Sequence, residues 1–336
     1  MIGRRNIPPE MFQELQQRYA KDGIETFTDI IIGLPGETYD SFTKGVEKII
    51  ENGQHNRIQF INLSILPNAP MAKPNYREQH GLISVESKII NIHGAPADFG
   101  DNIFEMQELV VGSAVMSLED WRQARVFAWT ASLLYFDKLL QIPIMLLRAT
   151  TGIDYVQQIK AFINLPGGRF PLLEELAGFF FAEAKRIQQG GSEFFYAPDW
   201  LGIYWPHDEY AYIRLSAENK LGAFYQEVYQ RLAELLSDNG HVCPPWLNEA
   251  INLNQILLKQ PYQAEDLVFR SDYDLLATCD EVRKTGIGSV VQQSACYVVN
   301  RKNELWTDWQ NWSRDVVWYG NKRGAYLYPY TRQEKH

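Results

Sequence analysis

The most constraining feature of this sequence is a pair of short apolar segments joined by a helix-length connection near the amino end. Residues 27–32 and 58–66 are rich in β-branched residues and are bounded by Gly or Pro, which is typical of buried strands. The amphipathic segment between them, with Thr38 as its cap and Asn52 at its end, predicts a helix. This order predicts a βαβ unit with two parallel strands and a right-handed crossover.

A further helix is predicted before this unit. Pro8 and Pro9 suit a helix start, Phe12, Leu15 and Tyr19 share one helical face, and Gly23 occupies the position after the last turn. Two strands do not make a sheet, because parallel sheets bury both faces and need more neighbours. We therefore expect the N-terminal region to be a piece of something larger.

Composition excludes several classes of protein. The chain has 336 residues, of which 46% are hydrophobic and 22% charged, so it can bury a large core and is not disordered throughout. Its net charge of −9 argues against nucleic-acid binding through a general basic field. No run approaches the ~20 apolar residues of a membrane span, and the N-terminal residues do not resemble a secretory signal. We therefore expect a cytoplasmic protein with neither a nucleic-acid nor a membrane partner.

The remainder of the chain divides near residue 112. Residues 67–112 are rich in Pro and Gly and predict loops. Ser117 opens a long helical stretch as a capping residue. Helices are predicted near 171–189, 217–237 and 245–259, and short strands at 267–269, 290–291 and 296–299. The predicted domains are thus residues 1–112 and a mainly helical, aromatic-rich domain, residues 113–336, with a β-rich end.

Cysteine and histidine spacing does not predict a metal site. The three cysteines, Cys243, Cys279 and Cys296, include no CxxC pair, which favours buried structural thiols. No histidine pair has the spacing of a helical metal site. His93 lies in a loop beyond the predicted strands, where a substrate contact is a minor alternative.

One histidine adjoins two carboxylates, in residues 207–209 (His-Asp-Glu). A solvated loop is the favoured interpretation, since adjacent charged residues usually face water. A metal or acid–base cluster, as in a hydrolase, is the alternative.

The C-terminal segment is unusually aromatic. Trp306, Trp309 and Trp312 recur every third residue, followed by Trp318 and Tyr319. The favoured interpretation is that these rings bury the terminal segment against helices. An aromatic surface for a flat ligand or a partner is the alternative.

The segment Asp29-Ile-Ile-Ile-Gly-Leu-Pro-Gly-Glu-Thr38 resembles the fifth-strand motif of radical SAM enzymes. Flanking features agree, because Arg5 precedes the helix that leads into this strand, and the next strand closes with Leu63-Ser-Ile-Leu-Pro67. Residues 68–71 and 116–129 are similar to the cobalamin-binding branch of that superfamily. The barrel resemblance covers about residues 1–80.

The resemblance implies a fold, cofactors and site residues. The family cleaves S-adenosylmethionine (SAM) at a [4Fe–4S] cluster inside a TIM-type barrel, and the cofactors supply the radical chemistry. It implies that Asp29 contacts the SAM ribose, that Arg5 lies near the SAM carboxylate or ribose, and that Ser64 and Ile65 contact adenine through their backbone. Gly33 and Gly36 would let the βα loop approach the ligand closely.

The sequence departs from the family at the cluster ligands. It contains no CxxxCxxC motif, and the glycine-rich second-strand motif is also missing. We therefore expect the C-terminal part of a radical SAM protein of the cobalamin type, as a truncated product, a split subunit or a fragment. A separate or missing N-terminal part would carry the cluster and cobalamin.

The expected fold is an α/β N-terminal segment, the end of a partial TIM-type barrel, followed by a mainly α-helical domain with a small β-rich end. The expected function is to supply part of the SAM site and a domain facing a small-molecule substrate, for methyl transfer or rearrangement. Such a chain would be inactive without the cluster-bearing part. The alternative is a non-enzymatic binding or scaffold protein that retains a barrel remnant.

Overall fold

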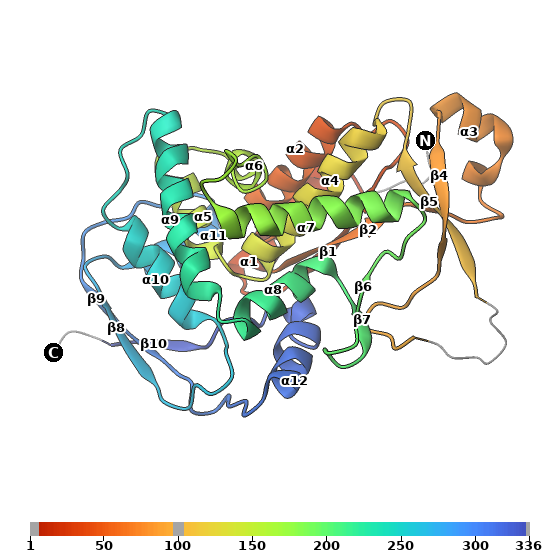
Figure 1. Cartoon of the computed structure of the whole chain (residues 1–336). Helices are drawn as coiled ribbons and strands as arrows, with labels where there is room; N and C mark the ends of the chain where they lie inside the picture. Colours follow the sequence, from red (N-terminus) through yellow and green to blue (C-terminus); the bar gives the residue numbers. More distant parts are fainter. Residues whose placement is uncertain (1–6, 97–103, 334–336) are drawn as a thin grey trace.

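The predicted βαβ unit is present in the computed structural model, which describes residues 7–96 and 104–333 (Figure 1). Strands β1 (Phe27–Ile32) and β2 (Arg57–Asn62) pair in parallel, and helix α2 (Tyr39–Glu51) connects them. Thr38 caps α2 as predicted: its side chain accepts a hydrogen bond from the Ser41 amide, and the Ser41 hydroxyl accepts one from the Thr38 amide.

Helix α1 (Pro9–Lys21) precedes this unit, and Gly23 follows it with a φ of 69°, as predicted. The face of this helix predicted to carry Phe12, Leu15 and Tyr19 is not a buried one, because Leu15 and Tyr19 are 36% and 38% exposed. The helix instead turns Gln16 inward, where its side-chain oxygen accepts a hydrogen bond from the Thr26 hydroxyl.

The two faces of the β1–β2 pair differ in what covers them. Helices α2 and α4 (Leu118–Ala131) lie over one face, where the Phe42 and Phe60 rings meet edge-on at a centroid distance of 6.0 Å. On the other face, Ile31 and Ile61 occupy the same register position and are 37% and 40% exposed. A parallel sheet usually has both faces buried, but within the described residues only one face of the β1–β2 pair is covered.

The second predicted strand, residues 58–66, is two strands in the structure. Strand β2 ends at Asn62, and β3 (Ser64–Ile65) leaves the parallel pair to join an antiparallel sheet of order β3-β5-β4. Residues 67–112, predicted to be loop-rich, contain short elements between the turns that Pro and Gly mark. These elements are η1 (Pro70–Ala72), α3 (Pro74–His80), β4 (Ile83–Lys88) and β5 (Met106–Gly112).

Helices dominate the chain after residue 117. Ser117 caps α4 as predicted, in a reciprocal capping box with Asp120. The long helix α7 packs across α4, and the short hairpin β6–β7 follows it (Figure 1). The helices and strands of this region are α4, the π-helical turn η2 (Ser132–Phe136), α5 (Gln141–Thr151), α6 (Tyr155–Lys160), α7 (Pro171–Gln188), β6 (Phe195–Ala197), β7 (Ile203–Trp205), α8 (His207–Ala217), α9 (Leu221–Asp238) and α10 (Leu247–Leu257).

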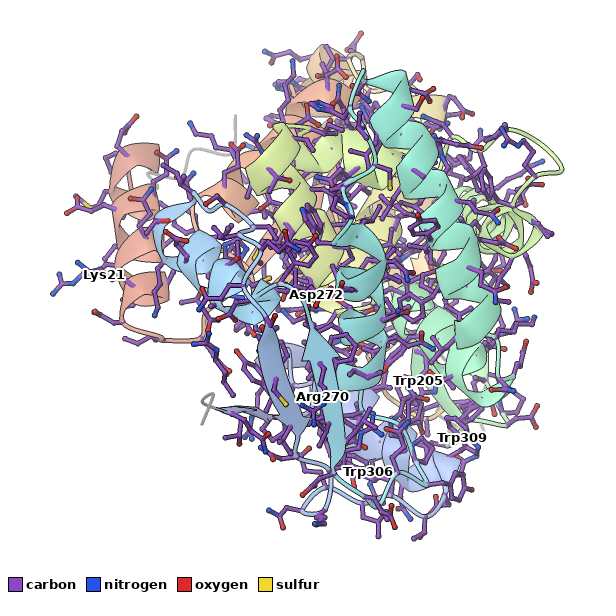
Figure 2. All side chains as sticks on the ribbon, turned by 90° about the vertical axis from the view of Figure 1, so that its left-hand side faces the viewer. Lys21, Trp205, Arg270, Asp272, Trp306 and Trp309 are labelled. Atoms are coloured by element: carbon purple, nitrogen blue, oxygen red, sulfur yellow. The ribbon has the colours of Figure 1, made fainter. Side chains whose placement is uncertain are left out.

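The C-terminal region is β-rich as predicted, although residues 290–291 form no strand. An antiparallel sheet of order β10-β9-β8 forms one end of the molecule. Figure 2 shows Arg270 and Asp272 at this sheet, with Trp306 and Trp309 near its lower end. The elements are β8 (Leu267–Ser271), α11 (Leu275–Thr285), β9 (Ala295–Val299), α12 (Trp309–Trp312), the π-helical turn η3 (Ser313–Trp318), η4 (Asn321–Arg323) and β10 (Tyr330–Gln333).

The aromatic C-terminal segment is partly core and partly surface. Trp312, Tyr326 and Tyr328 are buried, which confirms the favoured interpretation for these rings, whereas Tyr319 is 58% exposed. One hydrophobic core extends from Ile32 to Tyr328 and so includes residues on both sides of position 112. The division into two domains stays a prediction.

The helices of the described ranges individually fall short of a membrane span. No single helix there has both the length and the apolar character to cross a bilayer. One pair bent by 96°, residues 118–136 with 141–151, reaches them only in combination.

Candidate functional site

A cavity of about 550 Å³ lies beside β2, and residues from both faces of this strand line it. Its walls come from six places: β2 and β3, strand β5, the loop 89–93, helix α4 with the start of η2, the segments flanking the β6–β7 hairpin, and the end of η3 with η4. This volume suits a small organic molecule, and the wall combines aromatic rings with a few charged groups, as ligand sites commonly do. The lining residues with charged, hydroxyl or large aromatic side chains include Arg57, His93, Arg125, Trp129, Ser132, Glu193, Asp208 and Trp318.

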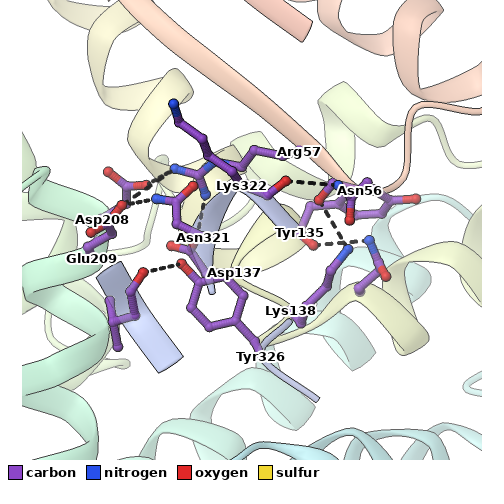
Figure 3. Close-up of polar contacts among 12 residues, drawn as sticks. Asn56, Arg57, Tyr135, Asp137, Lys138, Asp208, Glu209, Asn321, Lys322 and Tyr326 are labelled. Carbon is purple, nitrogen blue, oxygen red and sulfur yellow. Dashed lines mark hydrogen bonds and ion pairs between the residues drawn. The ribbon is translucent and has the colours of Figure 1, made fainter. Parts of the chain in front are cut away.

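Arg57, the first residue of β2, is the centre of a buried charge cluster (Figure 3). Its guanidinium lies 2.5 Å from a carboxylate oxygen of Asp137, 3.3 Å from Asp208 and 3.9 Å from Glu209. Burial opposes the charge on Arg57, but the carboxylates, Asp137 foremost, outweigh burial and raise the pKa of Arg57. The cluster ties β2 to α8 and to the residue that follows η2.

Glu209 links this cluster to His93. The His93 Nε2 lies 2.6 Å from a Glu209 carboxylate oxygen, and the Asn321 amide donates to the other oxygen. The His93 ring stacks on Trp318 at 5.1 Å and meets Trp205 edge-on at 5.2 Å. Burial raises the pKa of Glu209, although His93 opposes this shift. His93 has a φ of 58°, an uncommon backbone conformation, and the residue lines the cavity. This position supports the alternative interpretation of His93 as a substrate contact.

Arg125 is the second buried guanidinium in the cavity wall. It comes from α4, donates a 3.2 Å hydrogen bond to the Phe60 carbonyl and lies 4.5 Å from the Trp129 ring centroid. Desolvation lowers the pKa of Arg125 to about 10, and Glu193 and Asp208 only partly offset this. No carboxylate among the described residues lies within 4.0 Å of its nitrogens.

Two π-helical turns position the cavity wall. In η2 the Asp137 amide donates to the Ser132 carbonyl at 2.7 Å, which brings Ser132 to the cavity and Asp137 to Arg57. In η3 the Tyr319 amide donates to the Arg314 carbonyl at 2.9 Å, and Trp318 reaches the cavity. Such turns are rare and occur often at functional sites.

The structure places the residues that the motif resemblance selected as follows. Arg5 lies outside the described residues. Asp29 is exposed on the uncovered face of β1, in register with Gln59, a residue of the cavity wall. Ser64 lines the cavity, whereas the Ile65 side chain is buried in a small separate cluster that faces elsewhere.

The Gly33–Gly36 turn follows β1 directly. Gly33 has a φ of 91°, and a Cβ there would lie 3.5 Å from the Val110 carbonyl oxygen. Gly36 has a φ of 88° and open space around it. Both positions therefore favour glycine for backbone reasons, and Gly36 also leaves room for a ligand.

The prediction that residues 207–209 form a solvated loop is wrong. His207, Asp208 and Glu209 form the buried first turn of α8, and their side chains diverge. His207 bonds Glu183 at 2.9 Å, while Asp208 and Glu209 serve the Arg57 cluster. Within the described ranges no three His, Cys, Asp or Glu side chains are grouped to hold a metal ion, so the hydrolase alternative has no joint cluster to act through.

The cysteines do not fit a [4Fe–4S] cluster. Cys279 is buried in α11, and burial raises the pKa of its thiol to about 12, whereas a cluster ligand must be a thiolate. Cys243 follows α9 and Cys296 lies in β9, so the thiols belong to separate elements, and both are only half-buried. The expectation of buried thiols holds for Cys279 alone, and no cluster-dependent step is assigned to this chain.

Sequence reasoning missed most of the charges that build this cavity. Asp137 interrupts the apolar window of residues 133–147, whereas Arg57 and Arg125 follow other polar residues and gave no comparable signal. A charged residue inside an apolar stretch is a weak signal of a functional site. It is a signal because a buried charge needs a partner.

Comparison with curated proteins confirms the resemblance to the radical SAM superfamily, in its cobalamin-dependent branch. The cobalamin-dependent radical SAM methyltransferase TokK of Streptomyces tokunonensis is 33% identical over 169 residues, 50% of this chain and 24% of that protein. The 2-(S-pantetheinyl)-carbapenam-3-carboxylate methyltransferase of Streptantibioticus cattleyicolor is 32% identical over 155 residues, 46% of this chain and 22% of that protein. The chain therefore matches less than a quarter of the length of each relative. No family model matches the chain.

Proposed function

We propose that this chain supplies the C-terminal part of a radical SAM protein of the cobalamin type. Residues 1–112 would provide the closing strands of a TIM-type barrel, and residues 113–336 a domain that faces a small-molecule substrate. The observation that carries the proposal is the parallel β1–β2 pair, with helices over one face and a ligand-sized cavity lined by β2. In a TIM barrel, helices cover the outer face and ligands bind at the C-terminal ends of the strands, which agrees with Asn62 and Ser64 in the cavity wall.

The proposal gives each motif residue a role toward SAM. Asp29 accepts hydrogen bonds from the ribose hydroxyls, Ser64 and Ile65 offer backbone groups to adenine, and Gly33 and Gly36 shape the adjoining loop. Arg5 would serve the SAM carboxylate or ribose. Support comes from the exposed Asp29 carboxylate beside Gln59, and from Ser64 in the cavity wall.

Methyl transfer is the reaction that the relatives' names favour over a rearrangement. We propose that this chain binds and orients ligands and excludes water from them. Radical formation, which the family assigns to a cluster and SAM, and any contact with cobalamin would belong to another part of the protein. The cytoplasmic location expected from the sequence is part of the same proposal.

Support for a cluster-bearing partner comes from strand β1. In the described part of the chain β1 pairs only with β2, so its second edge has no strand beside it. Phe27 and Ile31 are 48% and 37% exposed on this strand. A parallel strand from a CxxxCxxC-bearing polypeptide, or from a preceding part of the same one, would pair with that edge. Co-expression with such a partner should slow hydrogen exchange of the β1 amides, and unchanged exchange in a stable complex would contradict this pairing.

A ligand titration tests the partial SAM site proposed for this chain, which we call the half-site. S-adenosylhomocysteine should bind the full chain by calorimetry, and Asp29→Ala should abolish binding while Asp29→Asn weakens it. Asp238→Ala, which removes an exposed carboxylate at the end of α9, is the matched control and should bind normally. No binding at millimolar ligand would favour the alternative, a non-enzymatic scaffold with a barrel remnant.

Iron reconstitution tests the absence of cluster chemistry from this chain. Treated anaerobically with iron and sulfide, the purified chain should retain no stoichiometric iron and show no cluster absorption, because its thiols are dispersed. Stoichiometric iron would contradict the need for a separate cluster-bearing part.

A further inference from the structure

The cavity wall contains two arginines with opposite electrostatic surroundings. Arg57 is matched by three carboxylates within 4 Å. Arg125 is equally buried, at 5% exposure, but among the described residues its only hydrogen-bond acceptor is the Phe60 carbonyl. A guanidinium has five N–H donors, so most of the donors of Arg125 remain to be used.

A second unpaired donor lies beside Arg125. The Nε of Arg125 and the indole Nε1 of Trp129 are both buried without an acceptor in the described part of the chain. The two residues are one helical turn apart on α4, the guanidinium lies over the Trp129 ring, and both line the cavity. Buried donors are nearly always satisfied, so this pair is expected to find acceptors in the cavity, from a bound ligand or from water that a ligand would displace.

The nearby carboxylates do not take this role. Glu193 accepts hydrogen bonds from the side-chain amides of Asn62 and Gln107, at 2.8 and 2.6 Å. Asp208 is held by Arg57 at 3.3 Å. Both acidic groups are therefore engaged elsewhere, and they balance the charge of Arg125 only from a distance.

We propose that Arg125 and the Trp129 N–H anchor the carboxylate of a small organic acid in this cavity. The ligand's body would be largely apolar, since Trp318, Phe194 and Phe60 contribute to the wall. This substrate class rests on the proposed function, under which the cavity receives the substrate.

The surrounding charges favour a carboxylate over a phosphate. One planar guanidinium edge matches the two oxygens of a carboxylate. A phosphate dianion would bring a second negative charge into a wall that already contains Glu193 and Asp208.

Paired ligands that differ in charge test the anchor. The full chain is titrated by calorimetry with 4-phenylbutanoate, its uncharged amide 4-phenylbutanamide, and phenyl phosphate. The carboxylate should bind at least about tenfold more tightly than the amide, the ratio expected for a charge-assisted hydrogen bond in a buried site. Equal affinities, or tighter binding of phenyl phosphate, would overturn the proposal.

Variants separate a ligand anchor from a structural arginine. Arg125→Gln should lose the preference for the carboxylate, and Arg125→Lys should retain part of it. Arg122→Gln, on the same helix but outside the cavity wall, is the control and should keep the full preference. Arg125→Met should melt at the wild-type temperature or above, since it removes an unpaired buried charge, whereas a lower melting temperature would indicate a structural role and overturn the proposal.

A third probe separates this inference from the proposed function. 5′-Methylthioadenosine has the adenine and ribose of SAM but no carboxylate. If the proposed half-site exists, this nucleoside binds wild type and Arg125→Gln equally and loses affinity in Asp29→Ala. Carboxylate selectivity without nucleoside binding would support the carboxylate anchor and reject the partial SAM site. Nucleoside binding without carboxylate selectivity would support the partial SAM site and reject the anchor.

Discussion

Substituting Asp137 with asparagine removes one charge from the buried cluster around Arg57 while preserving side-chain shape. Asp137 is fully buried and the Arg57 side chain is 5% exposed, so water cannot replace the lost partner. Breaking a buried ion pair on one side costs about 3–5 kcal/mol. Because Asp208 and Glu209 still face Arg57 at 3.3 and 3.9 Å, we expect the lower end, about 3 kcal/mol.

Urea unfolding followed by circular dichroism measures this free energy. Arg57→Met should cost more, about 5 kcal/mol, because it leaves Asp137, Asp208 and Glu209 without their shared cation. The double variant Arg57→Met/Asp137→Leu should cost less than the sum of the single changes, since the two groups are coupled.

The matched control is a pair of similar length at the surface. Arg148 and Glu51 lie 2.6 Å apart with side chains 32% and 39% exposed, so Glu51→Gln should cost less than about 1 kcal/mol. An Asp137→Asn protein that unfolds within about 1 kcal/mol of the wild type would refute the reasoning that this cluster is an obligatory buried network.

Three further predictions concern backbone strain and pH. Gly33→Ala puts a side chain at a φ of 91° and should cost about 1–2 kcal/mol in urea unfolding, whereas Gly45→Ala, inside α2 with open space around it, should be neutral or stabilising. Burial raises the pKa of Glu37 from 4.5 to about 7, so the folded protein binds a proton that the unfolded chain releases, and stability falls as pH rises through this window. Glu37→Gln should flatten that part of the melting-temperature profile. Burial opposes ionisation of Glu183, but hydrogen bonding, chiefly from His207, holds its pKa at about 2, so stability is lost as pH falls from 4.5 towards 2. Glu183→Gln should remove this acid dependence, and an unchanged profile in either variant would contradict the assignment.

The local elements were predictable where neighbouring residues determine them. The β1–α2–β2 unit follows from apolar runs and from the Thr38 cap, and α4 follows from the Ser117 cap. Prediction failed where a distant neighbour decides. Residues 64–65 leave the parallel pair because β5 offers them an antiparallel partner. The shared face of Leu15 and Tyr19 on α1 was visible in the sequence, but the pattern could not show whether a partner covers that face.

The candidate site was predictable only in part. The motif selected Asp29, which is in register with Gln59 of the cavity wall, and Ser64, which lines the cavity, but it did not reveal the charges of that wall. Residues 207–209 looked solvated because their partners come from elsewhere, with Arg57 lying 151 positions before Asp208. A buried charge is recognisable only together with its counter-charge, and pairing across such a separation leaves no local pattern.

The π-helical turn at residues 132–136 also has an evolutionary consequence. Such a turn is an α-helix with one residue inserted, and each residue of a helix accounts for about 100° of rotation. Deleting one residue there would restore an ordinary helix and swing everything downstream around its axis, withdrawing Asp137 from Arg57. The geometry of this wall thus depends on chain length as much as on side-chain identity, and relatives that lack the extra residue would have to build their pocket differently.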